Sequence, residues 1–556
     1  MSGNGRIYRI SALAVLGGTL IGFDISSMSA IISTQPYLCQ FNQRGFDQEG
    51  HCLGPTSDTQ GGVTAAMPGG SLIGALVSGW LSDRCGRKKT IMIGSVFWIA
   101  GSVVTCASVN LPMLAVGRFI NGFAVGICSA QVPVYITEIA PPTLRGRLVA
   151  MQQWAITWGI LIMYFICFGC SYIDGAGAFR IPWGLQMLPA IYLCVGLNFE
   201  PESPRWLFKK GREMEAKDVL AQLHGGGNAN SQFVQRELQD IKATVSKEHK
   251  HADASWLELF TPSMMNRTLI GVFTQIWSQL TGMNVMMYYI IYVFTMAGLS
   301  KAGTNDVLIP SSVSFIINVV MTVPAFMWMD CWGRRPPLLI GAALMCLWLT
   351  ITAIMFGVYA RNAEPGEFAS ASESMVVSGP AARVIIAATC LFVASFAPTW
   401  GPVSWTYPPE LFPLHLRGKA VALATSANWT FNFALAYFVP PAFENITWKT
   451  YVIFAVFCAV MFLHVFFFFP ETANKTLEEI EQIFDDKRPG VIKYIGTLAW
   501  KTHNDRKAMI THELRDSISD SEDGDKAQTN STEPGARDGI MTTTSNEPMP
   551  ASGNDA

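Results

Sequence analysis

The sequence predicts an all-α membrane protein with twelve transmembrane helices in two six-helix bundles. Hydrophobic residues make up 50% of the 556 residues and charged residues only 14%, against about 25% in a typical soluble protein. This charge is too sparse to cover a core of that size with a polar surface, so a lipid bilayer is the expected solvent. Long apolar stretches indicate the individual helices, and charged motifs that recur in both halves of the chain indicate the two bundles.

Apolar stretches of sufficient length occur throughout the first 470 residues. A helix needs about 20 mostly apolar residues to cross the hydrocarbon core. Twelve stretches meet this need, at about 8–30, 60–82, 90–109, 112–139, 147–171, 181–200, 267–297, 308–329, 337–359, 381–408, 418–442 and 449–469. The first is too long for a removable signal peptide and lacks a convincing small-residue cleavage site, so it is predicted as the first span.

Positive residues indicate the orientation, because cytoplasmic loops carry an excess of Lys and Arg. With the N-terminus in the cytoplasm, twelve of these residues fall in short inner segments and five in outer loops. The inner ones are Arg6, Arg9, Arg84, Arg87, Lys88, Lys89, Arg145, Arg147, Arg334, Arg335, Arg417 and Lys419, and the outer ones are Arg44, Arg180, Lys301, Arg361 and Lys449. Since the number of spans is even, both termini are expected to be cytoplasmic.

Four segments follow from this pattern. Residues 1–200 form an N-terminal six-helix bundle, and residues 267–470 form a C-terminal one. Between them, residues 201–266 are charged and helix-prone, as expected of a cytoplasmic helical linker. Residues 471–556 form a cytoplasmic tail. Beyond about residue 515 the tail is rich in Ser, Thr, Asp, Gly and Pro, which predicts disorder.

Three charged motifs follow spans two, four and six, and recur in the same order after spans eight, ten and twelve. In the first half they contain Asp83, Arg87, Glu138, Arg145, Glu202 and Arg205, and in the second Asp330, Arg334, Glu410, Arg417 and Glu471. Parallel repeats of this kind are typical of transporters whose halves rock around a central site.

The chemistry of these motifs favours a cytoplasmic latch. Carboxylate–Arg pairs are strong and directional, yet they separate once water enters. We expect the three carboxylates of the first half to face its three arginines, in the order Asp83, Glu138 and Glu202 with Arg87, Arg145 and Arg205. The alternative is that these are solvated loop charges that only fix the topology.

The strings that carry these motifs resemble the sugar-porter branch of the major facilitator superfamily. They are GWLSDRCGRKK, VYITEIAPPTLRGR, PESPRWL, SQLTGMNVMMYY, DCWGRR, PELFPLHLRGK and PETANKTLEE, and the resemblance covers about residues 1–485. Through GFDISSMSA and TQIWSQLTGMNVMMYY the chain looks most like fungal high-affinity monosaccharide–proton symporters. The resemblance implies a major facilitator fold in the plasma membrane that imports glucose, and other hexoses or xylose, with a proton.

Two ionisable residues lie inside the predicted spans, where charge is costly and usually functional. Asp24 in span one and Arg118 in span four are both six residues from the outer boundary, which is about 9 Å at 1.5 Å per residue. Equal depth and opposite charge predict a pair. If the pair separates during transport, the affinity of Asp24 for a proton changes, as proton coupling requires. The alternatives are a permanent structural pair and a proton-independent facilitator.

Amides at mid-span fit a sugar, because each hydroxyl both donates and accepts hydrogen bonds. The resemblance places six residues on sugar-contacting positions of the family, namely Gln153, Gln279, Asn284, Asn318, Trp405 and Asn428. The alternative for each amide is an ordinary hydrogen bond between helices.

Other classes of function find little support in the sequence. The twelve Cys show no zinc-ligand spacing, no nucleotide loop follows a strand, and no nucleophile–base arrangement appears. We therefore expect no metal, cofactor, nucleotide or enzymatic activity, and a net charge of −2 gives no reason to expect nucleic acid. A non-transporting sugar sensor stays open, as do the preferred sugar, the oligomeric state and a disulfide between Cys39 and Cys52.

Overall fold

The computed structural model describes residues 3–32, 34–46, 50, 52–141, 144–223, 228, 231, 234–235, 238–239, 241–242, 256–298, 308–362, 375–472, 480 and 484. Within these, the side chains of residues 3, 4, 145, 285, 308, 326, 330, 414 and 415 are not described. The described residues all belong to one compact unit. The predicted disorder beyond residue 515 lies outside the described residues.

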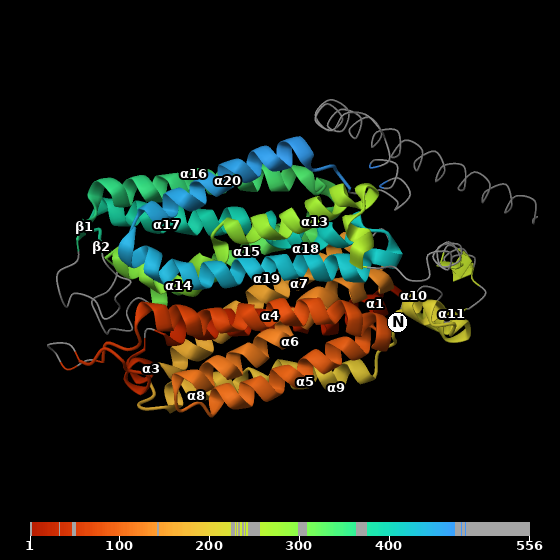
Figure 1. The fold of residues 1–556 in the computed structure, drawn as a ribbon, viewed down its shortest axis with the longest axis horizontal. Helices are drawn as coiled ribbons and strands as arrows, with labels where there is room; N and C mark the ends of the chain where they lie inside the picture. Colours follow the sequence, from red (N-terminus) through yellow and green to blue (C-terminus); the bar gives the residue numbers. More distant parts are fainter. Residues whose placement is uncertain are drawn as a thin grey trace, which may run out of the picture. The chain divides into compact units, whose positions relative to one another are not determined.

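Helices dominate the described residues (Figure 1). The first half contains α1 (Gly3–Ala14), α2 (Leu16–Ile31), α3 (Gln35–Gln40), α4 (Ser57–Cys85), α5 (Arg87–Cys106), α6 (Leu111–Ile139), α7 (Arg145–Cys170), α8 (Gly177–Leu185) and α9 (Met187–Asn198). Then come α10 (Pro204–Lys209), α11 (Glu213–Leu223) and the 3-10 helix η1 (Trp256–Phe260). The second half contains α13 (Pro262–Leu280), α14 (Met283–Met296), α15 (Leu308–Trp332), α16 (Arg335–Tyr359), α17 (Pro380–Phe396), α18 (Trp400–Leu411), α19 (Leu414–Asn445) and α20 (Lys449–Phe468).

All twelve predicted spans coincide with helices, and ten described helical segments are long and apolar enough to cross a membrane. The two others are those predicted at 267–297 and 418–442. The first is interrupted: α13 and α14 meet at Gly282, whose φ of +84° suits a residue without Cβ. The second is α19, a 32-residue helix whose buried face carries Asn428 and Asn432. Both depart from a uniform apolar helix because they place polar groups in the interior.

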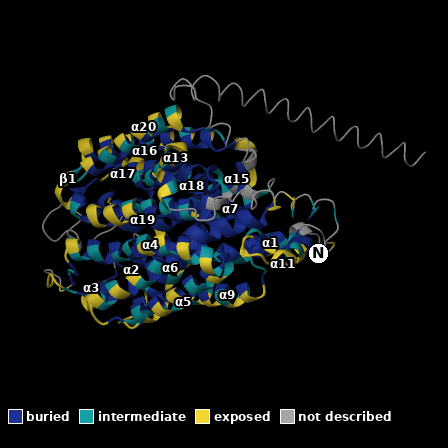
Figure 2. Cartoon of the chain, turned by 45° about the vertical axis from the view of Figure 1, so that its right-hand side comes forward, coloured by how far each residue is buried: buried dark blue, intermediate teal, exposed yellow. Residues whose placement is uncertain are grey.

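The two halves each pack on themselves and then on one another. In the first half α6 contacts α4 and α5, and α2 contacts α7, whereas in the second half α16 contacts α17 and α20, and α13 contacts α18 and α19. Between the halves, α4 lies along α19, α7 contacts α15 and α18, and α2 contacts α14. Figure 2 shows buried residues gathered where helices face one another and exposed residues on their outer sides.

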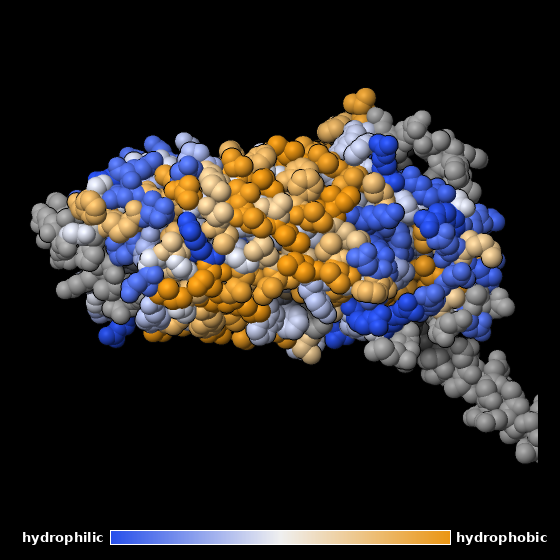
Figure 3. Space-filling view, turned by 90° about the horizontal axis from the view of Figure 1, so that it is seen from below, coloured by the Kyte–Doolittle hydropathy of each residue, from blue (hydrophilic) through white to orange (hydrophobic). Residues whose placement is uncertain are grey.

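A band of apolar side chains covers the middle of the molecular face in Figure 3, with hydrophilic residues at both ends. Large apolar side chains such as Val103, Ile162, Leu347 and Val456 are exposed. Exposed apolar patches of this extent require a partner, and for a chain with ten candidate spans that partner is the lipid bilayer.

The two ends of the bundle differ. At one end, called here the α3 end, Cys39 and Cys52 form a disulfide, and β1 (Arg361–Asn362) pairs antiparallel with β2 (Met375–Val376). The disulfide resolves the question that the sequence left open. At the other end, called the α10 end, lie α1, α10 and α11 (Figure 1).

Close contact between α4 and α6 depends on glycine. The hydroxyl of Ser71 in α4 donates to the carbonyl oxygen of Gly122 in α6 over 2.9 Å. A Cβ at Gly122 would collide with the carbonyl oxygen of Met67, a backbone atom that cannot rotate away. The backbones of the two helices therefore touch along this face.

Gly122→Ala should therefore destabilise the protein, because α4 and α6 would have to move apart. We expect a loss of about 1–3 kcal/mol, measured as a lower melting temperature of the detergent-solubilised protein. Gly62→Ala is the matched control on α4, since a Cβ there meets no atom within 4 Å. Equal melting temperatures for the two variants would contradict this packing.

Candidate functional site

Asp24 and Arg118 form a buried ion pair, as their matching depths predict. Arg118 Nη2 donates to Asp24 Oδ2 over 2.9 Å, and each residue is 1% exposed. Arg118 Nε also donates to the carbonyl oxygen of Val63 over 3.0 Å. The pair thus joins α2, α4 and α6, and a buried charge of either sign is compensated only while the pair stays intact.

Buried tyrosines surround this region, and sequence reasoning did not single them out. Tyr37 donates to Gln60 Oε1 over 3.1 Å, and Tyr289 donates to the carbonyl oxygen of Ala436 over 3.1 Å. The hydroxyl of Tyr288 is buried without a hydrogen-bond partner among the described residues. Because Tyr288 and Tyr289 belong to α14, which contacts α2, the second half of the chain reaches the ion pair through this helix.

Three of the predicted amides come together between α13, α14 and α19. Gln279 Nε2 donates to Asn428 Oδ1 over 3.0 Å, and Asn284 Nδ2 donates to Gln279 Oε1 over 2.7 Å. This amide cluster lies beside the break at Gly282. Its members form hydrogen bonds with one another, as is usual for buried polar groups.

Two more amides belong to the cluster, and the sequence analysis missed both. Gln275 Oε1 accepts from Asn428 Nδ2 over 2.5 Å, and Asn432 Nδ2 donates to Gln279 Oε1 over 2.9 Å. Gln275 precedes Gln279 by four residues, and Asn432 follows Asn428 by four. The spacing of four places each pair on one face of its helix, and that signal was present in the sequence.

Trp405 and Gln153 meet across the two halves. The indole Nε1 of Trp405 in α18 donates to Gln153 Oε1 in α7 over 3.1 Å. Asn318 lies in α15, where its Nδ2 contacts Met287 Sδ at 3.9 Å and its Oδ1 has no partner among the described residues. The described contacts do not join Asn318 to the other amides.

Arg87 is the centre of a charge network at the α10 end of the first half. Its Nε and Nη2 donate to Glu138 Oε1 over 3.1 and 3.0 Å, and Glu138 also accepts from the hydroxyl of Ser203. The carboxylate of Glu202 accepts from the backbone N–H of Arg87 and of Lys88 over 3.0 and 3.1 Å. Burial raises the pKa of Glu202, although these N–H groups and the nearby Arg87 favour its charged form.

The second half repeats this network group by group. Arg334 Nε and Nη2 donate to Glu410 over 3.1 and 2.7 Å, and Thr472 Oγ1 donates to the same carboxylate over 2.9 Å. Glu471 accepts from the backbone N–H of Arg334 over 2.8 Å. The structure therefore carries the sequence repeat down to individual hydrogen bonds.

The pairing in the first half differs in part from the expectation. Glu138 meets Arg87, whereas its expected pairing with Arg145 is not tested. Glu202 meets backbone N–H groups instead of Arg205. Asp83 does lie near Arg87, with Oδ1 3.6 Å from Nη1. The physical reason is the bend after α4, which turns the start of α5 toward the end of α6. The side chains of residues 145 and 330 lie outside the described part of the chain.

These ion pairs lie within a half, so they hold the helices of that half together. Contact between the halves at this end comes from elsewhere. Arg417 of the second half interacts electrostatically with Glu138 of the first, and a Cβ at Gly418 would lie 3.8 Å from Asp83 Oδ1. At the α3 end, a Cβ at Gly61 of α4 would lie 3.2 Å from the carbonyl oxygen of Tyr437 in α19. Helices α4 and α19, which belong to different halves, therefore lie close to each other near both of their ends.

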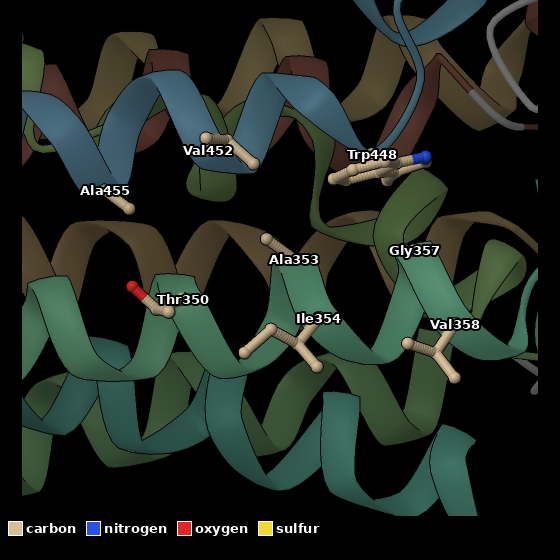
Figure 4. Close-up of a pocket in the computed structure, with 8 residues that line it drawn as sticks. All are labelled: Thr350, Ala353, Ile354, Gly357, Val358, Trp448, Val452 and Ala455. Carbon is tan, nitrogen blue, oxygen red and sulfur yellow. The ribbon is translucent and has the colours of Figure 1, made fainter.

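A groove of about 330 Å³ opens between α16 and α20, away from the amides (Figure 4). Its lining includes Ala353, Ile354, Val358 and Val452, with Trp448 at one end. Ile354 and Val358 are exposed on the outer side of the bundle, so hydrocarbon chains of the bilayer suit this groove. Its apolar walls offer too few hydrogen-bonding groups for a sugar.

Comparison with known proteins fits this geometry. The family model described as "Sugar (and other) transporter" matches residues 10–484. The chain belongs to the sugar transporter family. The buried ion pair, the amide cluster and the repeated charge networks are thus features of a sugar transporter with the major facilitator fold, which is not an enzyme.

Relatives of this sugar transporter include fungal glucose transporters. The chain is 44% identical over 494 residues to the MFS glucose transporter mfs1 of Aspergillus flavus, with 87% of this chain and 90% of that one covered. It is 43% identical over 504 residues to the high-affinity glucose transporter of Kluyveromyces lactis, with 90% and 87% covered. It is also 32% identical over 487 residues to the high glucose sensor RGT2 of Saccharomyces cerevisiae, with 85% and 60% covered.

Among solved structures, this sugar transporter resembles the proton:xylose symporter XylE bound to 6-bromo-6-deoxy-D-glucose. The TM-score is 0.72 at 27% sequence identity, with 87% of this chain and 100% of that chain covered. The shared fold therefore extends over the whole of the XylE chain.

Gln279→Ala should weaken sugar uptake, because Gln279 is bonded to three of the other amides and a buried group left unpaired costs about 1–3 kcal/mol. We expect a rise in KM at unchanged surface abundance. Gln131→Ala is the matched control, since Gln131 is a buried amide that bonds Ser78 away from the cluster. Normal uptake kinetics in Gln279→Ala would remove Gln279 from the site.

Arg87→Ala and Arg334→Ala should each destabilise the transporter to a similar degree. Each leaves a largely buried carboxylate without its cation, at a cost of about 3–5 kcal/mol, which thermal unfolding of the purified protein measures. Arg84→Ala is the control, because the Arg84 side chain is exposed over Trp80. Unchanged melting and uptake in both variants would mean that these charges only fix the topology.

Proposed function

We propose that this transporter imports a monosaccharide by proton symport, with glucose as a substrate and other hexoses or xylose as further ones. The relatives named as glucose transporters support the sugar, and the likeness to a proton:xylose symporter supports the coupling. The alternating exposure of one central site to the two sides would carry the sugar across.

The observation that carries the proposal is the ion pair of Asp24 with Arg118. Both side chains are buried inside the predicted spans, and a proton on Asp24 would break the pair. A proton on Asp24 removes the attraction to Arg118 and lets the two side chains separate. Helix α14 contacts α2, which carries Asp24, and α14 begins beside the amide cluster. A movement of α2 that follows protonation of Asp24 would therefore shift α14 and alter the proposed sugar site.

The sugar would bind at the amide cluster together with Gln153 and Trp405. Sugar hydroxyls would replace the amide–amide hydrogen bonds one for one, since each hydroxyl can donate and accept. The Trp405–Gln153 bond lies between the halves, so a sugar held there would contact both. Asn318 remains a proposed contact that would need a movement of its side chain or of the sugar toward α15.

The gate would lie at the α10 end, which we propose to be cytoplasmic, with both termini inside the cell and the protein in the plasma membrane. The bias of Lys and Arg toward this end supports the orientation. Residues 1–200 and 267–470 would act as two bundles, with the linker 201–266 and the tail 471–556 on the cytoplasmic side. Opening inward would separate Arg417 from Glu138 while each charge network stays within its bundle.

Two other functions predict different behaviour. A facilitator would move sugar without a proton, and the ion pair would then be structural. A sensor would bind sugar without moving it, and the similarity to the glucose sensor RGT2 gives that reading its support. This chain covers only 60% of that sensor. Uptake of labelled glucose and xylose in a transporter-null yeast, with and without a protonophore, separates all three.

Asp24→Asn should separate the two modes of transport. Asn keeps the size and hydrogen bonding of Asp but takes up no proton, so accumulation against a gradient and sugar-induced alkalinisation of the medium should vanish. Exchange or downhill flux should persist, because a neutral side chain mimics the protonated state. Wild-type uptake should fall as outer pH rises, since protonated Asp24 becomes rarer.

The matched control is Asp58→Asn, which neutralises an exposed carboxylate in the first turn of α4 and should leave accumulation intact. If wild-type uptake is insensitive to pH and protonophore, and the Asp24→Asn variant takes up sugar normally, the protein is a facilitator and the Asp24–Arg118 pair is structural.

A further inference from the structure

His464 is an ionisable residue inside the last span that the proposed mechanism does not use. It lies near the end of α20, a helix otherwise composed mainly of apolar residues. Ionisable residues within spans are costly and rarely accidental. Its surroundings therefore need an explanation.

The imidazole of His464 accepts a hydrogen bond from the helix that carries the sugar site. Trp277 Nε1 in α13 donates to His464 Nδ1 over 2.7 Å, and Trp277 is buried. An indole N–H can only donate, so His464 must be the acceptor, which requires a neutral ring with its proton on Nε2.

Aromatic rings enclose the imidazole on several sides. The ring centroid of Phe273 lies 5.0 Å away with the planes at 87°, and those of Phe468 and Phe469 lie 5.3 and 5.4 Å away. Phe469 stacks in turn on Tyr407 of α18. The ring of His464 is thus fixed between α13 and the segment that follows α20.

Trp277 is on the opposite side of α13 from the amides. It is two residues after Gln275 and two before Gln279, and two residues correspond to about 200° of rotation in an α-helix. The amides face α19, while the indole faces α20. The bond to His464 therefore lies on the side of α13 opposite to the side that carries the amides.

We propose that His464 is a positioning residue for the sugar site. Its neutral imidazole holds Trp277 and fixes the rotation of α13, so that the amides of this helix meet those of α19. The inference rests on the proposed function, because it assumes that sugar binds at the amide cluster. It adds a residue on a peripheral helix that touches no sugar and yet sets the affinity for it.

The test is glucose uptake kinetics in a transporter-null yeast, normalised to surface abundance, for a set of variants. His464→Phe keeps an aromatic ring but has no acceptor, and Trp277→Phe removes the donor. Each should raise KM about 3- to 10-fold, as expected for one lost buried hydrogen bond, with kcat within a factor of about 2. The double variant should be no worse than either single one, because both remove the same bond.

Rescue and control variants separate positioning from stability. His464→Asn offers an amide oxygen near the place of Nδ1 and should return KM close to the wild-type value. Trp348→Phe is the matched control, since it loses a similar indole bond, to Ser395 over 3.1 Å, between α16 and α17. It should leave KM unchanged.

Three results would overturn the inference. They are a wild-type KM in His464→Phe, an equal defect in His464→Asn and His464→Phe, and a loss of surface protein or kcat with KM unchanged. Glucose binding to the purified protein, followed by thermal shift, reports the same change as a shift in Kd even if transport proves facilitative or absent. Failure of proton coupling is therefore distinguishable from failure of this proposal.

Discussion

A protein interior that excludes water offers a charge or an amide no partner but another protein group, and this constraint organises the structure. Asp24 pairs with Arg118, Glu138 with Arg87, and Glu410 with Arg334. The amides of α13, α14 and α19 bond one another. Each group is satisfied by residues from other chain segments, so the polar contacts determine which segments must be neighbours, while the apolar surface determines only that they are buried.

The repeated charge networks bear on how the halves move. Each network joins three separate chain segments of its own half. An equivalent tyrosine adds a bond of 2.6 Å in each half, because Tyr135 donates to the carbonyl oxygen of Pro201 and Tyr407 to that of Pro470. Contacts between the halves at this end involve Arg417, Asp83 and glycine backbone. If the halves rock as proposed, each of them keeps these hydrogen bonds.

Much of this arrangement was readable in the sequence, and the remainder depended on rotation in three dimensions. Span length, the depth match of Asp24 with Arg118 and the repeat of the motifs follow from spacing along the chain. The pairing of Glu138 with Arg87 could not be predicted from spacing, because it depends on the bend after α4. Gln275 and Asn432 could have been predicted, because each lies four residues from a predicted amide and therefore on the same helix face. The His464–Trp277 bond had none, since no local pattern links residues 187 positions apart.

The break at Gly282 brings two helix ends to the middle of the spans. The carbonyl end of α13 carries about half a negative elementary charge, and the N–H end of α14 carries about half a positive one. The two ends lie beside each other at the amide cluster, so their fields nearly cancel over a distance as large as a small solute. An ion of either sign would gain little there, whereas a neutral polyol can meet donors at one end and acceptors at the other.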